Sequence, residues 1–461
     1  MKGTVMDSAV SGRRGHAVVI GASMGGLVVA RALADSFERV TLVDRDTLPD
    51  HPETRRGVPQ GRQVHGLLAR GREALEELFP GLSQELIAAG VPECDLQSQI
   101  HWYLGGQLLK PESSGLMGLA VSRALLEFTI RTRVARLPGV RFIERHDVAG
   151  LTASPDRSRI TGVRIRDRDD SAAAEAVLDA DLVVDAAGRS PHSPAWLAEL
   201  GYGPAPEEEA HIRLVYLSRL YRREPHHLGG RGGTAIAPYP GQLHGGFVLA
   251  QEGNRLILSI SGRAGEEPPT DDEGMAEYAG TLVTQDLAEV IRTAKPLSEP
   301  VVTRYPGSIR RHYEQVTDLP QDYLVAADAL CSFNPFYGQG MTVAALEGLT
   351  LTRLLGEGRE DLPRRFFEAT AKLLDTPWNM ALSGDMRLPD YEGPRSAALE
   401  QSAAYMQPYW AAAANDAVLA TALLRVTNML DDPARLTDPE LQARVLRALG
   451  QPDQPEVGTG G

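Results

Sequence analysis

Three short segments of this chain combine small residues with an acidic residue in arrangements suited to binding a phosphorylated nucleotide. The first segment opens with an apolar run at residues 17–20 that predicts a strand buried on both faces. A turn and a trailing acid follow, at Gly21, Ser23, Gly25, Gly26 and, after a second apolar run, Asp44. A strand, a glycine turn, a helix and a second strand ending on an acid form the unit that binds dinucleotides.

Each part of this unit has a physical role in nucleotide binding. Gly21 permits the tight turn, and Gly26 permits close packing of the helix on the sheet. The free N–H groups of the helix N-terminus attract a pyrophosphate, and Asp44 is placed to accept hydrogen bonds from a ribose. Ser23 replaces the usual middle glycine, and its hydroxyl can donate in compensation. The alternative interpretation is a glycine-rich turn in an ordinary βαβ unit.

Two further segments place similar residues after apolar runs. One is Asp185-Ala-Ala-Gly188-Arg189-Ser190, and the other runs from Ala327-Asp328 to Gly338-Gln339-Gly340-Met341. Ligands of open α/β sheets bind beyond the carboxyl ends of the strands, and all three segments occupy such positions. We therefore expect the three segments to converge on one cofactor.

The composition limits the classes of protein that fit. The chain has 461 residues, 43% of them hydrophobic, and a formal net charge of −14, with no basic cluster that would indicate nucleic acid or an anionic membrane. Cys94 and Cys331 form no C-x-x-C pair, so neither a disulfide scaffold nor a metal site is expected. The sequence contains no expected signal peptide or membrane span, which favours a cytoplasmic enzyme.

The hydrophobic pattern predicts an α/β protein with a Rossmann-type nucleotide-binding domain, an inserted antiparallel β-sheet domain and C-terminal helices. We expect a helix at 122–135 that begins after an N-cap at Ser122, a hairpin formed by 245–250 and 255–261, and a helix at 271–284. The expected division is a disordered tail at 1–14, the nucleotide domain at 15–200 and 305–380, with short substrate-side insertions near 70–120, the antiparallel substrate domain at 201–304, a helical region at 381–450 and a disordered tail at 451–461.

The three motifs together resemble the p-hydroxybenzoate-hydroxylase-type FAD-dependent monooxygenases. Within that group the likeness is greatest to the flavin epoxidases of polyether biosynthesis, through RRGVPQGRQVHGLL (55–68), SRALLEFTIR (122–131), DLVVDAAGRSPHSPAWLAELG (181–201), EEPPTDDEG (266–274) and FNPFYGQGM (333–341). The resemblance covers nearly the whole chain. It implies an FAD-binding fold and an enzyme that transfers one atom of O2 to an organic substrate through a flavin C4a-hydroperoxide.

The resemblance also implies roles for individual residues. Asp44, with its neighbour Arg45, would contact the adenosine ribose, Arg123 would bind phosphate or ribose oxygens, and Asp328 would bind the ribityl or pyrophosphate part of FAD. The backbone amides of Gly338, Gln339, Gly340 and Met341 would face the isoalloxazine ring. Arg56 and Gln60 would lie in a loop over the flavin.

Two positions depart from the family pattern. The usual Gly-Asp pair is Ala327-Asp328, which adds a methyl group to the turn. Ala187 stands where relatives carry an acid that helps with NADPH, so NADPH, NADH and a partner flavin reductase all remain possible electron donors. Flavin halogenases share the resemblance, but their W-x-W-x-I-P stretch is absent from this sequence.

Aromatic and basic side chains of the central segment could line a substrate cavity. The candidates are Tyr216, Arg219, Tyr239, Phe247, Pro335 and Phe336. The plain alternative is that the aromatic residues pack in a core and that Arg219 forms an ion pair. The 211–261 segment offers no evident buried acid, and an alkene needs no protein base, so epoxidation is favoured mildly over hydroxylation of a phenol.

The expected function is therefore an FAD-dependent monooxygenase of secondary metabolism that takes O2 and a small organic substrate. It is expected to act as a monomer or homodimer. The alternatives are a flavin reductase of the geranylgeranyl-reductase type, which shares the D-A-x-G pattern, and a nucleotide-binding module without activity.

Overall fold

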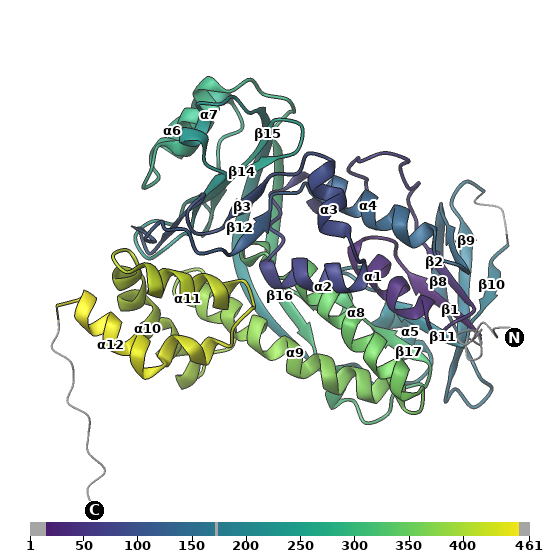
Figure 1. Ribbon diagram of the computed structural model, residues 1–461. Helices are drawn as coiled ribbons and strands as arrows, with labels where there is room; N and C mark the ends of the chain where they lie inside the picture. Colours follow the sequence, from purple (N-terminus) through teal and green to yellow (C-terminus); the bar gives the residue numbers. More distant parts are fainter. Residues whose placement is uncertain (1–14, 171–173, 451–461) are drawn as a thin grey trace, which may run out of the picture.

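A computed structural model describes residues 15–170 and 174–450 of the chain (Figure 1). The two tails predicted to be disordered, 1–14 and 451–461, lie outside the described residues. The fold is mixed α/β with a parallel core sheet, as the hydrophobic pattern predicts.

The core is a five-stranded sheet in which every neighbouring pair of strands is parallel. Its order is β17-β11-β1-β2-β7, with bounds β1 His16–Ile20, β2 Arg39–Val43, β7 Val140–Ile143, β11 Leu182–Asp185 and β17 Tyr323–Val325. Strands β1, β11 and β17 are fully buried, which explains their unbroken apolar runs. The carboxyl ends of these three strands carry the three segments that the sequence singles out.

Helices cover this sheet and bring distant parts of the chain together. They are α1 Met24–Ala34, α2 Ala69–Leu78, α3 Leu82–Ala88, α4 Arg123–Ala135, α5 Ser193–Glu199 and α8 Gly340–Glu357. Helices α1 and α8 pack side by side (Figure 1). A Cβ atom at Gly348 would lie 2.3 Å from Val28 Cγ1, so glycine permits this approach. The predicted N-cap of α4 is confirmed, since the Ser122 hydroxyl accepts a hydrogen bond from the Leu125 N–H.

A mixed eight-stranded sheet forms the second layer. Its order is β18-β16-β12-β15-β14-β13-β4-β5, with bounds β4 Ile100–Leu104, β5 Gln107–Leu108, β12 Glu207–Arg222, β13 Gly233–Ile236, β14 Gly245–Gln251, β15 Arg255–Gly262, β16 Val301–Arg311 and β18 Cys331–Ser332. The predicted hairpin β14–β15 is present. Strand β4 pairs in parallel with β13, although it comes from the segment between two helices of the core domain. The 201–304 range therefore contains only the central strands of this sheet.

The predicted helix at 271–284 is present but ends earlier than expected. The 271–284 segment forms α6, Asp272–Gly280, and the chain turns before α7, Asp286–Thr293. Both helices pack their apolar faces on the sheet, where Met275 and Leu287 are fully buried. A single straight helix could not present both faces to the same sheet, so tertiary packing decides the break.

Smaller elements complete the described part. They are β3 Glu93–Asp95, β6 Met117–Leu119, the antiparallel sheet β8 His146–Ala153, β9 Ile160–Asp167 and β10 Ala176–Asp179, and the 3-10 turns η1 Pro59–Arg62, η2 His227–Gly230, η3 Tyr313–Gln315, η4 Ala327–Ala329, η5 Pro335–Tyr337 and η6 Pro433–Thr437.

The described C-terminal part of the chain, from 362 to 450, is mostly helical, as predicted. The helices are α9 Leu362–Asp385, α10 Ala397–Ala413, α11 Ala417–Thr427 and α12 Pro439–Ala448. Helix α9 runs from the core domain to the other three, which form a separate group (Figure 1). Their core is shared with β4 and its flanking residues, including Leu96 and Ile100. None of the helices in the described ranges is both long and apolar enough to cross a membrane.

The contact between α1 and the turn after β17 generates a testable prediction. Ala327 has a left-handed backbone, with φ of 56°, and a Cβ atom at Gly25 would lie 2.5 Å from the Ala327 Cβ atom. Gly25→Ala should lower the free energy of unfolding by about 1–3 kcal/mol because of this clash. Ala327→Gly should change stability by less than about 1 kcal/mol, since relief of the left-handed strain is offset by the entropy of glycine.

The double variant distinguishes a direct clash from general damage. In denaturant unfolding, the double variant Gly25→Ala with Ala327→Gly should lose less free energy of unfolding than the sum of the two single losses, by at least about 1 kcal/mol. Gly356→Ala, whose added Cβ meets nothing within 4 Å, serves as the control and should combine additively with Ala327→Gly. Additive effects for the Gly25 pair would contradict the contact.

Candidate active site

A single cavity of about 1410 Å³ joins the carboxyl ends of the parallel strands to the C-terminal helices. Small-molecule pockets commonly have volumes of about 300–1,000 Å³, so this cavity has room for more than one ligand. All three segments singled out in the sequence contribute to its wall. They are close together in space although they are far apart along the chain.

The structure brings most of the predicted site residues into this wall. Those lining the cavity are Gly21, Ser23, Gly25, Asp44, Arg45, Gln60, Arg123, Tyr216, Phe247, Asp328, Pro335, Phe336, Gly338, Gln339, Gly340 and Met341. Four predicted residues do not line it, namely Gly26, Arg56, Arg219 and Tyr239.

The glycine turn shows why Gly26 lies behind the wall. A Cβ atom at Gly26 would lie 1.9 Å from the Gly21 carbonyl oxygen, and one at Gly21 would lie 2.7 Å from the Ala186 carbonyl oxygen. Gly21 also has a left-handed backbone, with φ of 97°. Gly26 therefore serves helix packing, while Gly21 and Gly25 leave the backbone open to the cavity.

Ser23, the departure from the usual glycine, takes part in a buried polar network. Its hydroxyl donates to Glu127 Oε2 at 3.0 Å and accepts from Arg123 Nη2 at 2.7 Å. Arg123 pairs with Glu127 at 3.1 Å, one helical turn further along α4. The serine thus fixes the guanidinium at the point where the turn meets the cavity.

Arg55, which sequence reasoning missed, ties this network to Asp44. Its Nη1 donates to Asp44 at 3.0 Å and to Asp46 at 2.9 Å, and its Nε donates to Glu127 at 3.0 Å. The Nη2 atom of Arg55 is buried without a hydrogen-bond partner in the described part of the chain. The expectation placed the neighbouring Arg56 near the flavin, but that side chain is exposed. Adjacent arginines in a loop carry no pattern that tells which one points inward.

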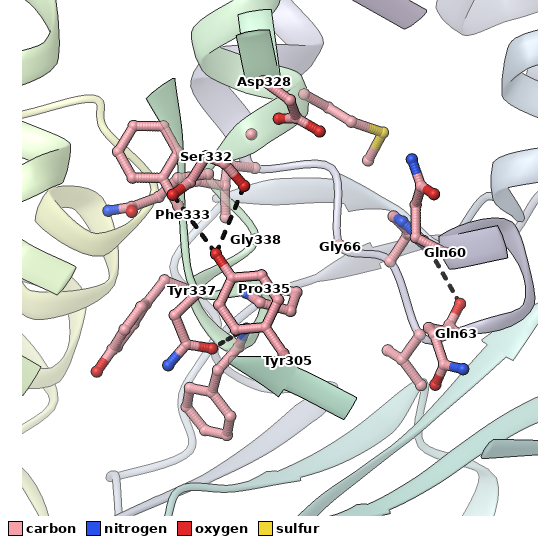
Figure 2. A pocket seen from close by; sticks show the side chains of 18 of the residues that line it. Gln60, Gln63, Gly66, Tyr305, Asp328, Ser332, Phe333, Pro335, Tyr337 and Gly338 are labelled. Atoms are coloured by element: carbon pink, nitrogen blue, oxygen red, sulfur yellow. Dashed lines mark hydrogen bonds between the residues drawn. The ribbon is translucent and has the colours of Figure 1, made fainter. Parts of the chain in front are cut away.

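Asp328 faces the cavity from the turn after β17 (Figure 2). Burial raises the pKa of its carboxyl group, and the positive charges of Arg123 and Arg189 oppose that rise. Its carboxylate makes no hydrogen bond with any residue in the described ranges, so its oxygens are available to a ligand.

The Gly338-Gln339-Gly340 segment leads into the N-terminus of α8. Gly338 has a left-handed backbone, with φ of 66°, and a Cβ atom added there would lie 3.4 Å from the Gly66 carbonyl oxygen, so the two segments are neighbours in the cavity wall (Figure 2). Gln339 is buried, and its Oε1 atom has no partner within the described ranges. The first N–H groups of a helix lack partners within the helix, which favours an electron-rich ligand here.

Asp185 plays a supporting part. Its carboxylate accepts hydrogen bonds from the Ser193 hydroxyl and, at 2.9 Å, from the Ala187 N–H. It does not line the cavity, whereas Ala187 and Gly188 do. Asp185 therefore stabilises the turn after β11 and the start of α5, and it does not face the cavity.

Burial shifts the pKa of two further side chains near the motif segments, His65 and Cys331. His65 lines the cavity, and burial lowers the pKa of its imidazole to about 4, so the ring is neutral at neutral pH. Cys331 is buried in the core, where burial raises the pKa of its thiol well above the usual value. This thiol is poorly suited to act as a nucleophile.

Two residues expected in the substrate pocket lie elsewhere. Arg219 pairs with Asp272 and donates to the Ser298 carbonyl oxygen at 2.8 Å, which is the ion-pair alternative considered above. Tyr239 forms a backbone bridge with Gln242, beyond the cavity wall. Both residues belong to the central segment in which the substrate pocket was expected. Arg219 lies on the side of β12 that faces away from the cavity, and Tyr239 lies in the loop after β13.

A buried polar cluster beside the Gly338 segment was not expected. Asp385 Oδ1 accepts hydrogen bonds from Arg263 at 2.9 Å, Asn334 at 2.9 Å and Tyr337 at 3.2 Å. Arg263 also pairs with Asp390 at 3.0 Å. Burial raises the pKa of Asp385 to about 6. The acid comes from the end of α9, outside the segment in which a buried acid was sought.

Comparison with known proteins places the chain in a family. It is 32% identical to Protein Rv3254 of Mycobacterium tuberculosis over 455 residues, which cover 92% of each chain. The chain belongs to the family of that protein. No protein-family model matches it.

Solved structures establish the type of fold. The flavin-dependent brominase Bmp2 aligns with a TM-score of 0.65 and 14% identity over 95% of this chain and 98% of its own. A flavoprotein/dehydrogenase from Cytophaga hutchinsonii aligns with a TM-score of 0.65 and 16% identity, over 94% of this chain and 97% of its own. OxyS anhydrotetracycline hydroxylase from Streptomyces rimosus aligns with a TM-score of 0.60 and 18% identity, over 91% of this chain and 76% of its own. The chain therefore has the fold of the flavin-dependent monooxygenases and halogenases.

Glu347 generates a prediction about pH. Its Oε2 accepts the Ala327 N–H at 2.6 Å, and burial raises its pKa to about 8. The unfolded chain loses this proton near pH 4.5, so the folded state binds more protons between about pH 4.5 and 8, and stability falls as the pH rises through that window. Glu347→Gln should reduce this fall by about 2 kcal/mol or more.

The measurement is denaturant unfolding at pH 5 and pH 8. Glu360→Gln, an exposed change just beyond the same helix, is the control and should have the same free energy of unfolding as the unmodified protein at both pH values. An equal fall in stability for the unmodified protein and for Glu347→Gln would show that the carboxyl group is not held protonated.

Proposed function

We propose that this protein is an FAD-dependent monooxygenase that inserts one atom of O2 into a small organic substrate. The observation that carries the proposal is the single cavity in which the three motif segments meet an apolar chamber. Such a cavity suits a flavin at the strand ends with a substrate held beside it. The fold of flavin-dependent relatives supports the same conclusion.

The residues present fit FAD. Asp328, Arg55 Nη2 and Gln339 Oε1 each offer a polar group without a partner in the described part of the chain. Gly25 and Gly338 belong to the wall of the cavity. In the proposal, Arg55 and Arg123 hold the adenosine and pyrophosphate end, Asp44 accepts from the ribose, and Asp328 accepts from the ribityl chain. Arg45, Gly21, Ser23, Gln60, Gly340 and Met341 complete the lining.

When bound and reduced, FAD would activate O2 and supply the transferred oxygen atom. The protein must then hold the substrate close and exclude water. Tyr216, Phe247 and Phe336 line the chamber beside the Gly338 segment, and the rings of Phe247 and Phe336 lie 4.9 Å apart. This apolar wall would shield the reacting atoms, and the backbone amides at the start of α8 would stabilise negative charge on the reduced ring.

Epoxidation and hydroxylation both fit this chamber. The sequence favoured an alkene because no buried acid was evident, but Asp385 places a buried acid in the cavity wall. That reason for preferring epoxidation is therefore removed. A likeness to the polyether epoxidases, and a place in secondary metabolism, remain part of the proposal.

The electron donor in this proposal is NADPH or NADH, or a partner flavin reductase. Asp185 is engaged as a cap, and Ala187 offers no acid to a nicotinamide nucleotide, so a separate reductase fits as well as direct reduction. A halogenase is less suitable, because the lysines of the described ranges, Lys110, Lys295 and Lys372, do not line the cavity. The flavin halogenases that this sequence resembles use an active-site lysine.

Asp328 provides the direct test of cofactor binding. Asp328→Ala should weaken FAD binding about tenfold or more, because a charged hydrogen-bond acceptor to the cofactor is lost. The visible flavin absorbance of the purified protein, before and after reconstitution with FAD, measures the occupancy. Asp318→Ala, an exposed change in the preceding loop, is the control and should retain full occupancy. An unmodified protein that takes up no FAD would refute the proposal.

The reaction class needs a second measurement on the FAD-loaded protein. A monooxygenase should consume O2 and release H2O2 when NADPH, NADH or a flavin reductase reduces it without substrate. A reductase of the geranylgeranyl-reductase type should instead deliver hydride to an alkene with no consumption of O2. The second result would replace the proposed reaction while leaving the cofactor assignment intact.

A further inference from the structure

The part of the cavity farthest from the parallel strands is an apolar chamber built by the C-terminal helices. Its lining includes Met380, Leu388, Tyr405, Met406, Leu423 and Leu436. These side chains surround a space continuous with the motif segments, so a molecule bound there would reach toward the proposed flavin. Surfaces of this kind select ligands that are largely apolar.

One cation interrupts this apolar wall. Arg387 follows the end of α9, lines the chamber, and lies over the ring of Trp410, with its Cζ atom 4.0 Å from the ring centroid. Its Nε and Nη1 atoms are buried without a hydrogen-bond partner in the described part of the chain, and Trp410 Nε1 is in the same state. The guanidinium forms no ion pair with a carboxylate of the described residues.

The nearest acid does not serve as the missing partner. Asp385 Oδ1 already accepts from Arg263, Asn334 and Tyr337, and Asp390 pairs with Arg263. The negative charge of Asp385 acts on Arg387 at longer range and favours its charged form, against the effect of burial. It supplies no acceptor to the Arg387 N–H groups.

Arg387 itself is half-buried, but buried N–H groups without acceptors, such as its Nε and Nη1, are unfavourable unless a ligand satisfies them. The unpartnered groups are N–H donors on Arg387 and Trp410, and a carboxylate matches the guanidinium in charge and in planar geometry. We propose that Arg387 anchors the carboxylate of the substrate, and that the substrate is an apolar carboxylic acid. This inference rests on the proposed function for the identity of the ligand as a substrate.

The arrangement also assigns an orientation. The carboxylate would lie against Arg387 and Trp410, and the apolar body would extend along the chamber toward Phe336 and the Gly338 segment, which lines the same cavity. Arg387 is then a positioning residue that fixes which carbon reaches the proposed flavin. The Trp410 ring limits the motion of the guanidinium through the stacking contact.

The test compares acids with their neutral esters on the FAD-loaded protein. Dodecanoate and 2-naphthoate are titrated against methyl dodecanoate and methyl 2-naphthoate, and binding is followed by the change in flavin absorbance and by the shift in melting temperature. At least one acid should bind the unmodified protein about tenfold or more tightly than its ester, as expected for a charged hydrogen bond. Equal binding of acid and ester for both pairs, or no binding of either acid, would overturn the proposal.

Variants assign the preference to the residue. Arg387→Met should bring the acid-to-ester ratio close to one, and Arg387→Lys should retain part of the preference. Arg395→Met removes an exposed arginine that packs on Tyr391 outside this chamber, and it should retain the full preference. Flavin content and melting temperature show that each variant is folded, and Arg387→Gln replaces Arg387→Met if that protein does not fold. An unchanged preference in the folded Arg387 variant would overturn the assignment.

The two proposals fail separately. A protein that takes up no FAD but still prefers the acids by melting temperature refutes the monooxygenase while supporting the anion anchor. A protein that binds FAD and consumes O2, but does not distinguish acids from esters, refutes the anchor alone.

Discussion

The site depends on how closely helix α1 approaches the ends of the parallel strands. Gly26 lies against the Gly21 carbonyl, and Gly25 lies against the methyl group of Ala327. Each contact is so close that a Cβ atom added to the glycine would clash with its neighbour. Because these contacts join β1, α1 and the turn after β17, they bring the first and third motif segments together. The turn after β11 packs against the same point through Ala186. Backbone packing at one place therefore creates the wall of the cavity.

Electrostatics divides the cavity into two ends. At the end formed by the strands, Arg55 and Arg123 are held by Asp44, Asp46 and Glu127, so the buried charges are paired with one another. At the other end, Arg263 pairs with Asp385 and Asp390. Buried charges are stable mainly when they are paired. Asp328 and Arg387 face the cavity without an ion pair in the described ranges, and they are for that reason groups through which ligands are proposed to bind.

Local patterns predicted much of the fold. The buried runs of β1, β11 and β17, the Ser122 cap of α4 and the β14–β15 hairpin are all recognisable because each depends on residues close together in the chain. The helix expected at 271–284 is present as α6 but ends at Gly280, and the following helix α7 was not expected, because both helices are placed by packing on a sheet formed from distant strands. Pairing of β4 with β13 was unpredictable for the same reason.

The amino-acid sequence by itself determined the class of fold, the three motif segments and most of the residues around the proposed cofactor, since glycine turns and strand-end acids are local features. Tertiary structure alone decided which of two adjacent arginines is buried, that Arg219 turns to Asp272, and that Asp385 and Arg387 from the end of α9 reach the cavity. The direction of a side chain and the choice of its partner depend on segments that fold against it, as Glu127 does against Arg55 and Asp272 against Arg219. No local pattern contains that information.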